Sequence, residues 1–244
     1  KYQKRIQATI TSETKFISVE LASNKSASAA LLDSLGLPVP RQEIVGSERE
    51  AVRAADKVGF PVVVKPLDGN HGRGISINLM THDQVAEAFH VAKEVSRSVI
   101  VESFLEGEDH RMLVVNGKLV AVAKRVPGHV VGDSKHTIAE LVEAVNQDPR
   151  RGVGHEKVLT RLELDYAAQQ IMDKKGYTAE TVLPNGEVCY LRDTANLSTG
   201  GTAIDLTDQV HPDNKEMAER AIKAVGLDVG GVDFLTTDIS RSYL

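Results

Sequence analysis

Hydrophobic residues recur at helical spacing in several separate stretches of the chain. In residues 81–95 the apolar side chains fall on one face of a helix, and Thr81 with Gln84 forms a capping pair at its start. Comparable start, period and stop signals predict further helices at about 23–35, 47–59, 164–174 and 212–226, with a short helix beginning at Thr137.

Short β-branched or alternating runs lie between these helices. Residues 61–66 read Pro-Val-Val-Val-Lys-Pro, which predicts a buried strand. The pair Asn116-Gly117 predicts a tight hairpin between 109–115 and 118–126. Other strands are expected at 75–79, 98–102, 188–192 and 229–236.

Residues 128–162 differ from the rest because they are polar and irregular apart from the short helix at Thr137. We interpret this stretch as a mobile insertion or lid.

Composition excludes several classes of protein. No apolar run approaches the roughly 18 to 20 residues that a membrane span needs, so we expect no membrane role. The net charge of −5 and the absence of Trp argue against a nucleic-acid-binding surface. A start without a signal peptide and a single cysteine, Cys189, predict a cytoplasmic location. The chain opens at Lys1 without a Met, and we interpret it as a piece of a longer polypeptide.

A glycine-rich loop follows the buried strand. Gly69, Gly72 and Gly74 can expose backbone amides to a phosphate, but the spacing fits neither the dinucleotide fingerprint nor a Walker A loop, and a plain turn explains it equally. Lys65 stands at the strand end, where an unpaired ammonium is costly to bury. A phosphate partner removes that cost, and a lysine that reaches solvent is the alternative.

These residues resemble the ATP-grasp superfamily in order and spacing. The resemblance rests on residues 62–66, 68–74 and 101–107, and it extends over nearly the whole chain through phrases at 4–9, 129–142, 148–152 and 191–201. Within the superfamily the chain is most similar to the ATP-grasp region of the cyanophycin synthetases. Several phrases also resemble the C-terminal part of bifunctional glutathione synthetases.

The resemblance implies an α+β fold in which two α/β lobes clasp ATP, with a lid insertion. It implies a connecting segment at 1–22, a first lobe at 23–104 that carries the glycine-rich loop, and a truncated second lobe at 105–244 with the lid at about 128–178.

The implied nucleotide contacts are distributed along both lobes. Lys25 and Lys65 are expected to contact phosphates, and Asp109 to hold the ribose hydroxyls, with Glu108 as its alternative. Asp233 matches a magnesium-binding carboxylate, whereas the second carboxylate of the family would lie beyond Leu244. The phosphate loop and the adenine slot are assigned to Gly69, Asn70, His71, Gly72, Gly74, Glu102, Ser103, Phe104 and Leu105.

The implied reaction uses ATP and Mg²⁺ to activate a carboxylate as an acyl phosphate, which an amine then attacks. Arg192 and Asn196 are candidates for binding the transferred phosphoryl group, and Arg111 for binding the oxyanion. The pair Gly200-Gly201 is either a second oxyanion donor or a structural turn. His71 either contacts phosphate and moves a proton or is a simple loop residue.

The resemblance to the cyanophycin synthetases implies addition of L-aspartate to the C-terminus of a poly-aspartate primer, in a homo-oligomer whose longer chain carries a Mur-ligase-like domain. A carboxylate-rich primer would pair with the basic residues Arg125, Arg150, Arg151 and Lys157, although these are equally explained as solvated charges. Ligation of glycine to γ-glutamylcysteine is the alternative within the superfamily. A nucleotide-binding module without turnover is the alternative from another class.

Overall fold

The computed structural model describes residues 5–68, 74–154 and 156–244, and the predictions for Gly69, Asn70, His71 and Gly72 lie outside these ranges. The chain divides into two compact units. Unit 1 holds residues up to 107, 112–121 and 209–244, and unit 2 holds 108–111 and 122–208. Each unit is described by itself.

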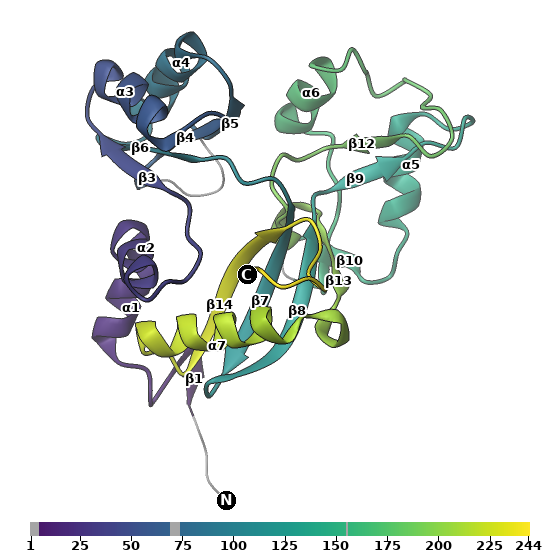
Figure 1. Cartoon of the computed structure of the whole chain (residues 1–244). Helices are drawn as coiled ribbons and strands as arrows, with labels where there is room; N and C mark the ends of the chain where they lie inside the picture. The colour runs from purple at the N-terminus through teal and green to yellow at the C-terminus, as the bar shows by residue number, and fades with distance from the viewer. Residues whose placement is uncertain (1–4, 69–73, 155) are drawn as a thin grey trace, which may run out of the picture. The chain divides into compact units, whose positions relative to one another are not determined.

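Unit 1 contains a four-stranded antiparallel sheet whose order is β3-β6-β4-β5 (Figure 1). The strands are β3 (Gln42–Val45), β4 (Val62–Pro66), β5 (Ser76–Leu79) and β6 (Val99–Ser103). Helices α3 (Glu48–Val58) and α4 (His82–Lys93) pack on one face of this sheet. The core between them is built from small and β-branched residues, among them Ala51, Ala55, Val62, Val64, Val99 and Val101.

Because side chains alternate along a strand, every second residue of β4 and β6 faces away from this core. Val62 and Val64 of β4 belong to it, so Lys65 lies on the opposite sheet face. Val99 and Val101 of β6 also belong to this core, so Glu102 lies on the opposite sheet face together with Lys65.

The remainder of unit 1 is built around α7 (Pro212–Val225), which packs on α1 (Phe16–Ser23), α2 (Lys25–Ser34) and the strand β14 (Val229–Thr236). A Cβ atom added to Gly230 would lie 2.6 Å from Cδ1 of Ile222 in α7. The Gly230 side of β14 therefore faces α7, and Asp233, an odd number of positions away, lies on the other side. The short strands β1 (Ile6–Gln7) and β2 (Ile10–Thr11) form a separate ribbon.

A second four-stranded sheet has the order β13-β8-β7-β14. Strands β7 (Glu108–Val115) and β8 (Lys118–Val126) form the predicted hairpin, with positive φ angles of 49° at Asn116 and 72° at Gly117. Positive φ at both turn residues matches the twist of the strands, which confirms the hairpin prediction. Strand β13 (Thr202–Asp205) pairs with β8 within unit 2.

Unit 2 is more regular than the sequence suggested. Its other elements are β9 (His129–Val131), α5 (Ile138–Asn146), β10 (Arg151–Gly152), β11 (Leu159–Thr160), α6 (Tyr166–Asp173), β12 (Val188–Tyr190) and the 3₁₀ turns η1 (Leu197–Thr199) and η2 (Thr207–Gln209). Their apolar residues form one buried cluster that includes Val130, Ile138, Leu162, Met172, Leu183 and Leu191. The prediction that 128–162 is irregular was wrong, because its few apolar residues meet partners about 50 positions away.

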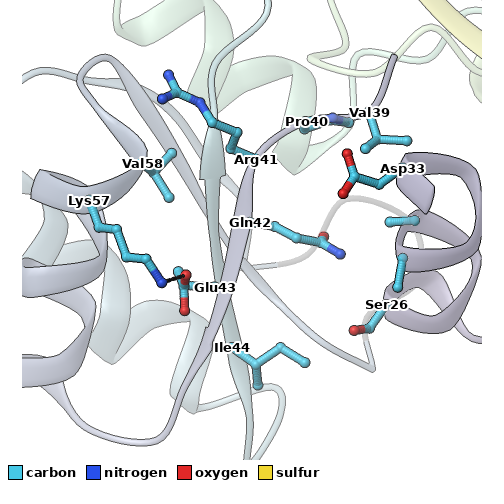
Figure 2. A pocket seen from close by; sticks show the side chains of 12 residues that line it. Ser26, Asp33, Val39, Pro40, Arg41, Gln42, Glu43, Ile44, Lys57 and Val58 are labelled. Atoms are coloured by element: carbon cyan, nitrogen blue, oxygen red, sulfur yellow. Dashed lines mark hydrogen bonds and ion pairs between the residues drawn. The ribbon is translucent and has the colours of Figure 1, made fainter. Parts of the chain in front are cut away.

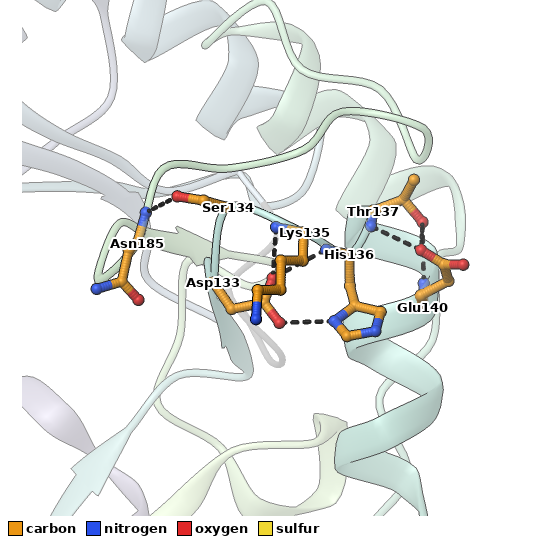
Figure 3. Close-up of polar contacts among 7 residues, drawn as sticks. All are labelled: Asp133, Ser134, Lys135, His136, Thr137, Glu140 and Asn185. Atoms are coloured by element: carbon orange, nitrogen blue, oxygen red, sulfur yellow. Dashed lines mark hydrogen bonds and ion pairs between the residues drawn. The ribbon is translucent and has the colours of Figure 1, made fainter.

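The connection between β9 and α5 is a compact polar turn (Figure 3). The Asp133 carboxylate accepts the backbone N–H groups of Lys135 and His136 at 2.9 Å and binds the His136 ring at 2.6 Å. These bonds lower the pKa of Asp133, and the carboxylate raises the pKa of His136 above its usual 6.5. The Thr137 hydroxyl oxygen accepts the Glu140 N–H at the start of α5, and the Glu140 carboxylate accepts the Thr137 N–H. The two bonds form a complete capping box.

Most predicted helices and strands lie within a few residues of their expected bounds. The elements α1, β3 and β13 were not predicted, and neither were the short strands β1, β2, β9, β10 and β11 or the 3₁₀ turns η1 and η2. Ser47 caps α3 by accepting the Glu50 N–H, and the Glu50 carboxylate accepts a bond from the Gly46 N–H. Within the described ranges, no helix is long and apolar enough to span a membrane.

We predict that Thr137→Ala lowers the free energy of unfolding by about 1 kcal/mol, because it leaves N-terminal amides of α5 without their acceptor. Thr137→Ser keeps a hydroxyl acceptor and is the matched control. Urea denaturation of the three proteins measures the difference, and equal stability of Thr137→Ala and Thr137→Ser would contradict the assignment.

Candidate functional site

The central feature of unit 1 is an ion pair on the sheet face opposite α3 and α4. Lys65 Nζ lies 2.5 Å from Glu102 Oε1, and their side chains are 20% and 14% exposed. The pairing of β4 with β6 sets this contact, since Val63 lies opposite Glu102 and Lys65 lies opposite Ile100. The lysine therefore does not extend freely into solvent, and its charge is held where water is scarce.

The chain leaves β6 through the residues predicted to form the adenine slot. The N–H of Ser103 donates to Arg41 O at 2.9 Å, and the N–H of Phe104 donates to Pro61 O at 3.0 Å. Leu105 is 42% exposed, and its N–H makes no backbone hydrogen bond with the residues that the structure describes. Leu105 thus offers a backbone donor to a ligand, while Ser103 and Phe104 use theirs to hold the strand.

Gly74 is the described end of the glycine-rich loop. It has a φ of +72°, and a Cβ atom there would lie 3.0 Å from both Pro66 Cγ and Val95 Cγ2. Any side chain at position 74 would meet the end of β4 and the turn after α4, so only glycine lets the backbone lie this close to Pro66 and Val95.

The other two predicted phosphate and metal residues of unit 1 lie outside this sheet. Lys25 is the first residue of α2 and is exposed; Asn24 caps this helix by accepting the Ala27 N–H at 3.0 Å. Asp233 is exposed on β14, on the side away from α7. In the described part of the chain, no group of three or more His, Cys, Asp or Glu side chains is arranged to hold a metal.

In unit 2 the predicted ribose residue is already paired. Arg125 Nη2 donates to both carboxylate oxygens of Asp109 at 2.7 and 2.8 Å, and these side chains are 21% and 30% exposed. The neighbouring Glu108 binds Lys124 at 2.6 Å. Arg125 therefore orients the Asp109 carboxylate, instead of standing free for a polymer as one sequence hypothesis proposed. The Asn116-Gly117 pair predicted that β7 lies beside β8. The ion pair between Asp109 and Arg125 was not predicted.

Arg192 and Asn196 also hold positions through local bonds. The Arg192 guanidinium donates to the Leu191 carbonyl at 2.7 Å and to Asp165, the cap of α6, at 3.0 Å. The Asn196 side-chain oxygen accepts the Ser198 N–H at 3.2 Å and so caps η1. Arg111 is exposed on β7, on the same hairpin as Asp109.

The Gly200-Gly201 pair is a structural turn. The Gly200 N–H donates to Leu197 O and the Gly201 N–H to Asn196 O, so neither amide is free for an oxyanion. A Cβ atom on Gly201 would lie 2.7 Å from Asn196 O. Buried Arg151 donates to the carbonyls of Gly200 and Thr160 at 3.0 and 2.6 Å, which corrects its interpretation as a lid cation.

The structure therefore brings together Lys65 and Glu102 on one sheet face of unit 1, whereas Gly74 contacts Pro66 and Val95 on the side of α4. In unit 2 it brings together Asp109 and Arg125, and Arg111 lies on the same strand as Asp109. Cys189 is buried in the unit 2 cluster, and burial raises the pKa of its thiol.

The chain is similar to several known proteins. Residues 22–133 match the RimK-like ATP-grasp domain. The chain is 53% identical over 239 residues to a cyanophycin synthetase of Trichormus variabilis, covering 98% of the chain and 26% of that protein. It is 34% identical to a glutathione biosynthesis bifunctional protein of Streptococcus agalactiae, covering 96% of the chain and 32% of that protein.

A solved structure gives the same relationship. The bifunctional glutathione synthetase of Pasteurella multocida superposes with a TM-score of 0.68 at 33% identity, covering 96% of this chain and 32% of that one. The chain spans about a quarter to a third of the length of these relatives. The predicted α+β architecture is confirmed, and the chain is similar over nearly its whole length to a segment of the cyanophycin synthetases, with a match to the RimK-like ATP-grasp domain over residues 22–133.

Proposed function

We propose that this chain is the ATP-binding part of an ATP-dependent carboxylate–amine ligase that adds L-aspartate to the C-terminus of a poly-aspartate primer. The observation that carries the proposal is an identity of 49–53% with several cyanophycin synthetases over 98% of the chain. The primer, the Mur-ligase-like domain, the homo-oligomer and the cytoplasmic location belong to the same proposal.

The chemistry explains why cations must line such a site. A primer carboxylate has to approach the γ-phosphorus of ATP although both carry negative charge, so phosphate oxygens must be neutralised and the reactants held in line. Lys65 supplies a cation that is already desolvated, and Lys25 supplies a second one. The incoming amine then attacks the acyl phosphate and phosphate leaves, which requires donors aimed at the developing oxyanion.

The residues of unit 1 fit a nucleotide. The Lys65 ammonium is partly buried and held by a single carboxylate, which a polyphosphate can replace as its partner. The Leu105 N–H offers a backbone donor of the kind that binds the edge of a base. Within this proposal Glu102, Ser103, Phe104 and Leu105 form the adenine slot, and the loop from Gly69 through Asn70, His71 and Gly72 to Gly74 closes on the phosphates.

The residues also fit a magnesium ion that arrives with the nucleotide. Mg²⁺ is commonly held by one or two carboxylates together with substrate phosphates, so exposed Asp233 suits it without a dedicated cluster. When bound, the ion supplies neutralisation of phosphate charge.

The remaining roles fall to unit 2 and to the loop. Asp109, oriented by Arg125, accepts the ribose hydroxyls. Arg192 turns its unbonded guanidinium donors to the phosphoryl group, assisted by Asn196, while Arg111 is the oxyanion donor and His71 the proton carrier. We assign 23–104 and 105–244 as the two functional lobes, 1–22 as the connecting segment and about 128–178 as the lid.

A second candidate is ligation of glycine to γ-glutamylcysteine. The relatives that favour it are the glutathione biosynthesis bifunctional proteins, which are 34–36% identical over 95–96% of the chain. Because these relatives are less similar to the chain than the cyanophycin synthetases are, glycine ligation is the second candidate and aspartate addition the first.

Substrate pairing separates the candidates. We expect the full-length polypeptide to release ADP with aspartate and a poly-aspartate primer that ends in a free carboxylate, because this pair supplies the acid and the amine of the proposed reaction. Release of ADP only with glycine and γ-glutamylcysteine would establish the second candidate. Nucleotide binding without ADP release from either pair would indicate a binding module.

Lys65→Met is expected to lower the rate of ADP release at least about hundredfold, since it removes charge stabilisation of the transferring phosphoryl group. Lys118→Met is the matched control, because Lys118 makes a surface ion pair with Glu219. Adding Glu102→Gln to Lys65→Met removes the carboxylate left without its partner, so a folding defect is separated from a catalytic one. Full activity of Lys65→Met would contradict the phosphate assignment.

Asp109→Asn tests the ribose assignment against its neighbour. We expect the parent protein to bind ATP about tenfold tighter than 2′-deoxy-ATP, because a carboxylate acceptor favours the hydroxyl. Asp109→Asn should lose most of this preference, and Glu108→Gln should keep it, as measured by titration calorimetry. The opposite pattern would move the role to Glu108.

A further inference from the structure

A cavity of about 570 Å³ lies along β3 in unit 1 (Figure 2). It is bounded by α2, by the segment that joins α2 to β3, by β3 and by the end of α3. A volume of this size is typical of a ligand site. The proposed ligase chemistry makes no use of the residues of β3 or of the end of α3.

The backbone of β3 is open on the side of this cavity. β3 is the edge strand of its sheet, and the Arg41 carbonyl accepts the Ser103 N–H of β6 at 2.9 Å. In an antiparallel pair, bonded residues alternate, so Gln42 and Ile44 direct their N–H and C=O groups away from β6. In ranges 5–68, 74–154 and 156–244 no backbone group bonds to these outward groups. Such an edge is a template for another strand.

The cavity also reaches the side chains on both sides of β3. Figure 2 shows Gln42 directed toward α2, whereas Arg41 and Glu43 lie toward α3. Ile44 is 47% exposed, so this edge keeps an apolar contact available as well. A peptide strand added beside β3 sends alternate side chains to the same two sides, whereas a small ligand has no need of both.

The charges on the two sides are opposite. Glu43 is paired with Lys57. Arg41 is exposed and lies near the end of α3, with Nη2 3.6 Å from the position of a Cβ atom on Gly59. Asp33 is exposed on the α2 side. Among the described residues, neither Arg41 nor Asp33 forms an ion pair. The α3 side therefore offers a cation, and the α2 side an anion.

We propose that this cavity binds an extended peptide by strand addition to β3, and that the peptide carries acidic and basic residues at alternate positions. Its backbone pairs with Gln42 and Ile44, its acidic side chains face Arg41, and its basic side chains face Asp33. The inference does not rest on the proposed ligase activity, because it uses only the edge, the cavity and the charges beside them.

Two synthetic peptides of equal composition and net charge test the pattern. The probe is acetyl-Glu-Lys-Glu-Lys-Glu-Lys-amide carrying a fluorophore, and the control is acetyl-Glu-Glu-Glu-Lys-Lys-Lys-amide. Anisotropy should show the alternating peptide binding at least about tenfold tighter, because only it presents one sign of charge to each side of β3. At saturation, hydrogen exchange of the Gln42 and Ile44 amides should slow. Equal affinity for the peptides, no binding of the alternating peptide, or unchanged exchange would overturn the proposal.

Variants separate backbone pairing from charge. Ile44→Pro removes an N–H that points away from β6, so the sheet should persist while peptide binding is lost. Arg41→Glu should weaken the alternating peptide about tenfold, and Arg49→Glu, the same charge change on the exposed first turn of α3, should not. If Ile44→Pro fails to fold, the affinities of Arg41→Glu and Arg49→Glu for the alternating peptide still test the proposal. An equal loss of affinity in these two variants would overturn it.

Discussion

The Lys65–Glu102 ion pair is the interaction on which the rest of the site depends. It exists because two strands that are not neighbours in sequence, β4 and β6, are neighbours in the sheet, and because α3 and α4 cover the opposite face. With only 20% and 14% of the two side chains exposed, neither charge is well solvated, so each needs a partner. In our account a nucleotide phosphate becomes that partner for Lys65. The ion pair with Glu102 holds the Lys65 ammonium at the position where it binds the phosphate.

The Asp109–Arg125 ion pair of unit 2 follows the same physical logic. Asp109 is not a free carboxylate waiting for a sugar; Arg125 holds both of its oxygens from the next strand. A fixed carboxylate loses less conformational entropy when it accepts hydroxyl groups. The turn at Asn116-Gly117 brings these strands together, so a local backbone preference positions Asp109, seven residues before Asn116, beside Arg125, eight residues after Gly117.

Much of this architecture was predictable from signals within a few neighbouring residues. Contacts between residues far apart in the sequence were not. Capping residues such as Thr81 and Thr137 indicated helices, and the β-branched run at β4 indicated a strand, because these signals act within a few residues. The partner of Lys65 was not predictable in the same way, since Glu102 reaches it only through sheet order. Unit 2 was misread for the same reason, as its cluster joins Val130 and Ile138 to Leu183 and Leu191.

The edge of β3 shows a further consequence of sheet order. β3 itself was not predicted, and only the folded sheet reveals that Gln42 and Ile44 line a cavity with backbone groups that no backbone group of the described residues pairs.

The most direct test of the central claim is a crystal structure of the chain with a non-hydrolysable ATP analogue and Mg²⁺. We expect Lys65 Nζ within hydrogen-bond distance of a phosphate oxygen and the base beside Leu105. A nucleotide bound elsewhere, with the Lys65–Glu102 pair unchanged, would contradict the account.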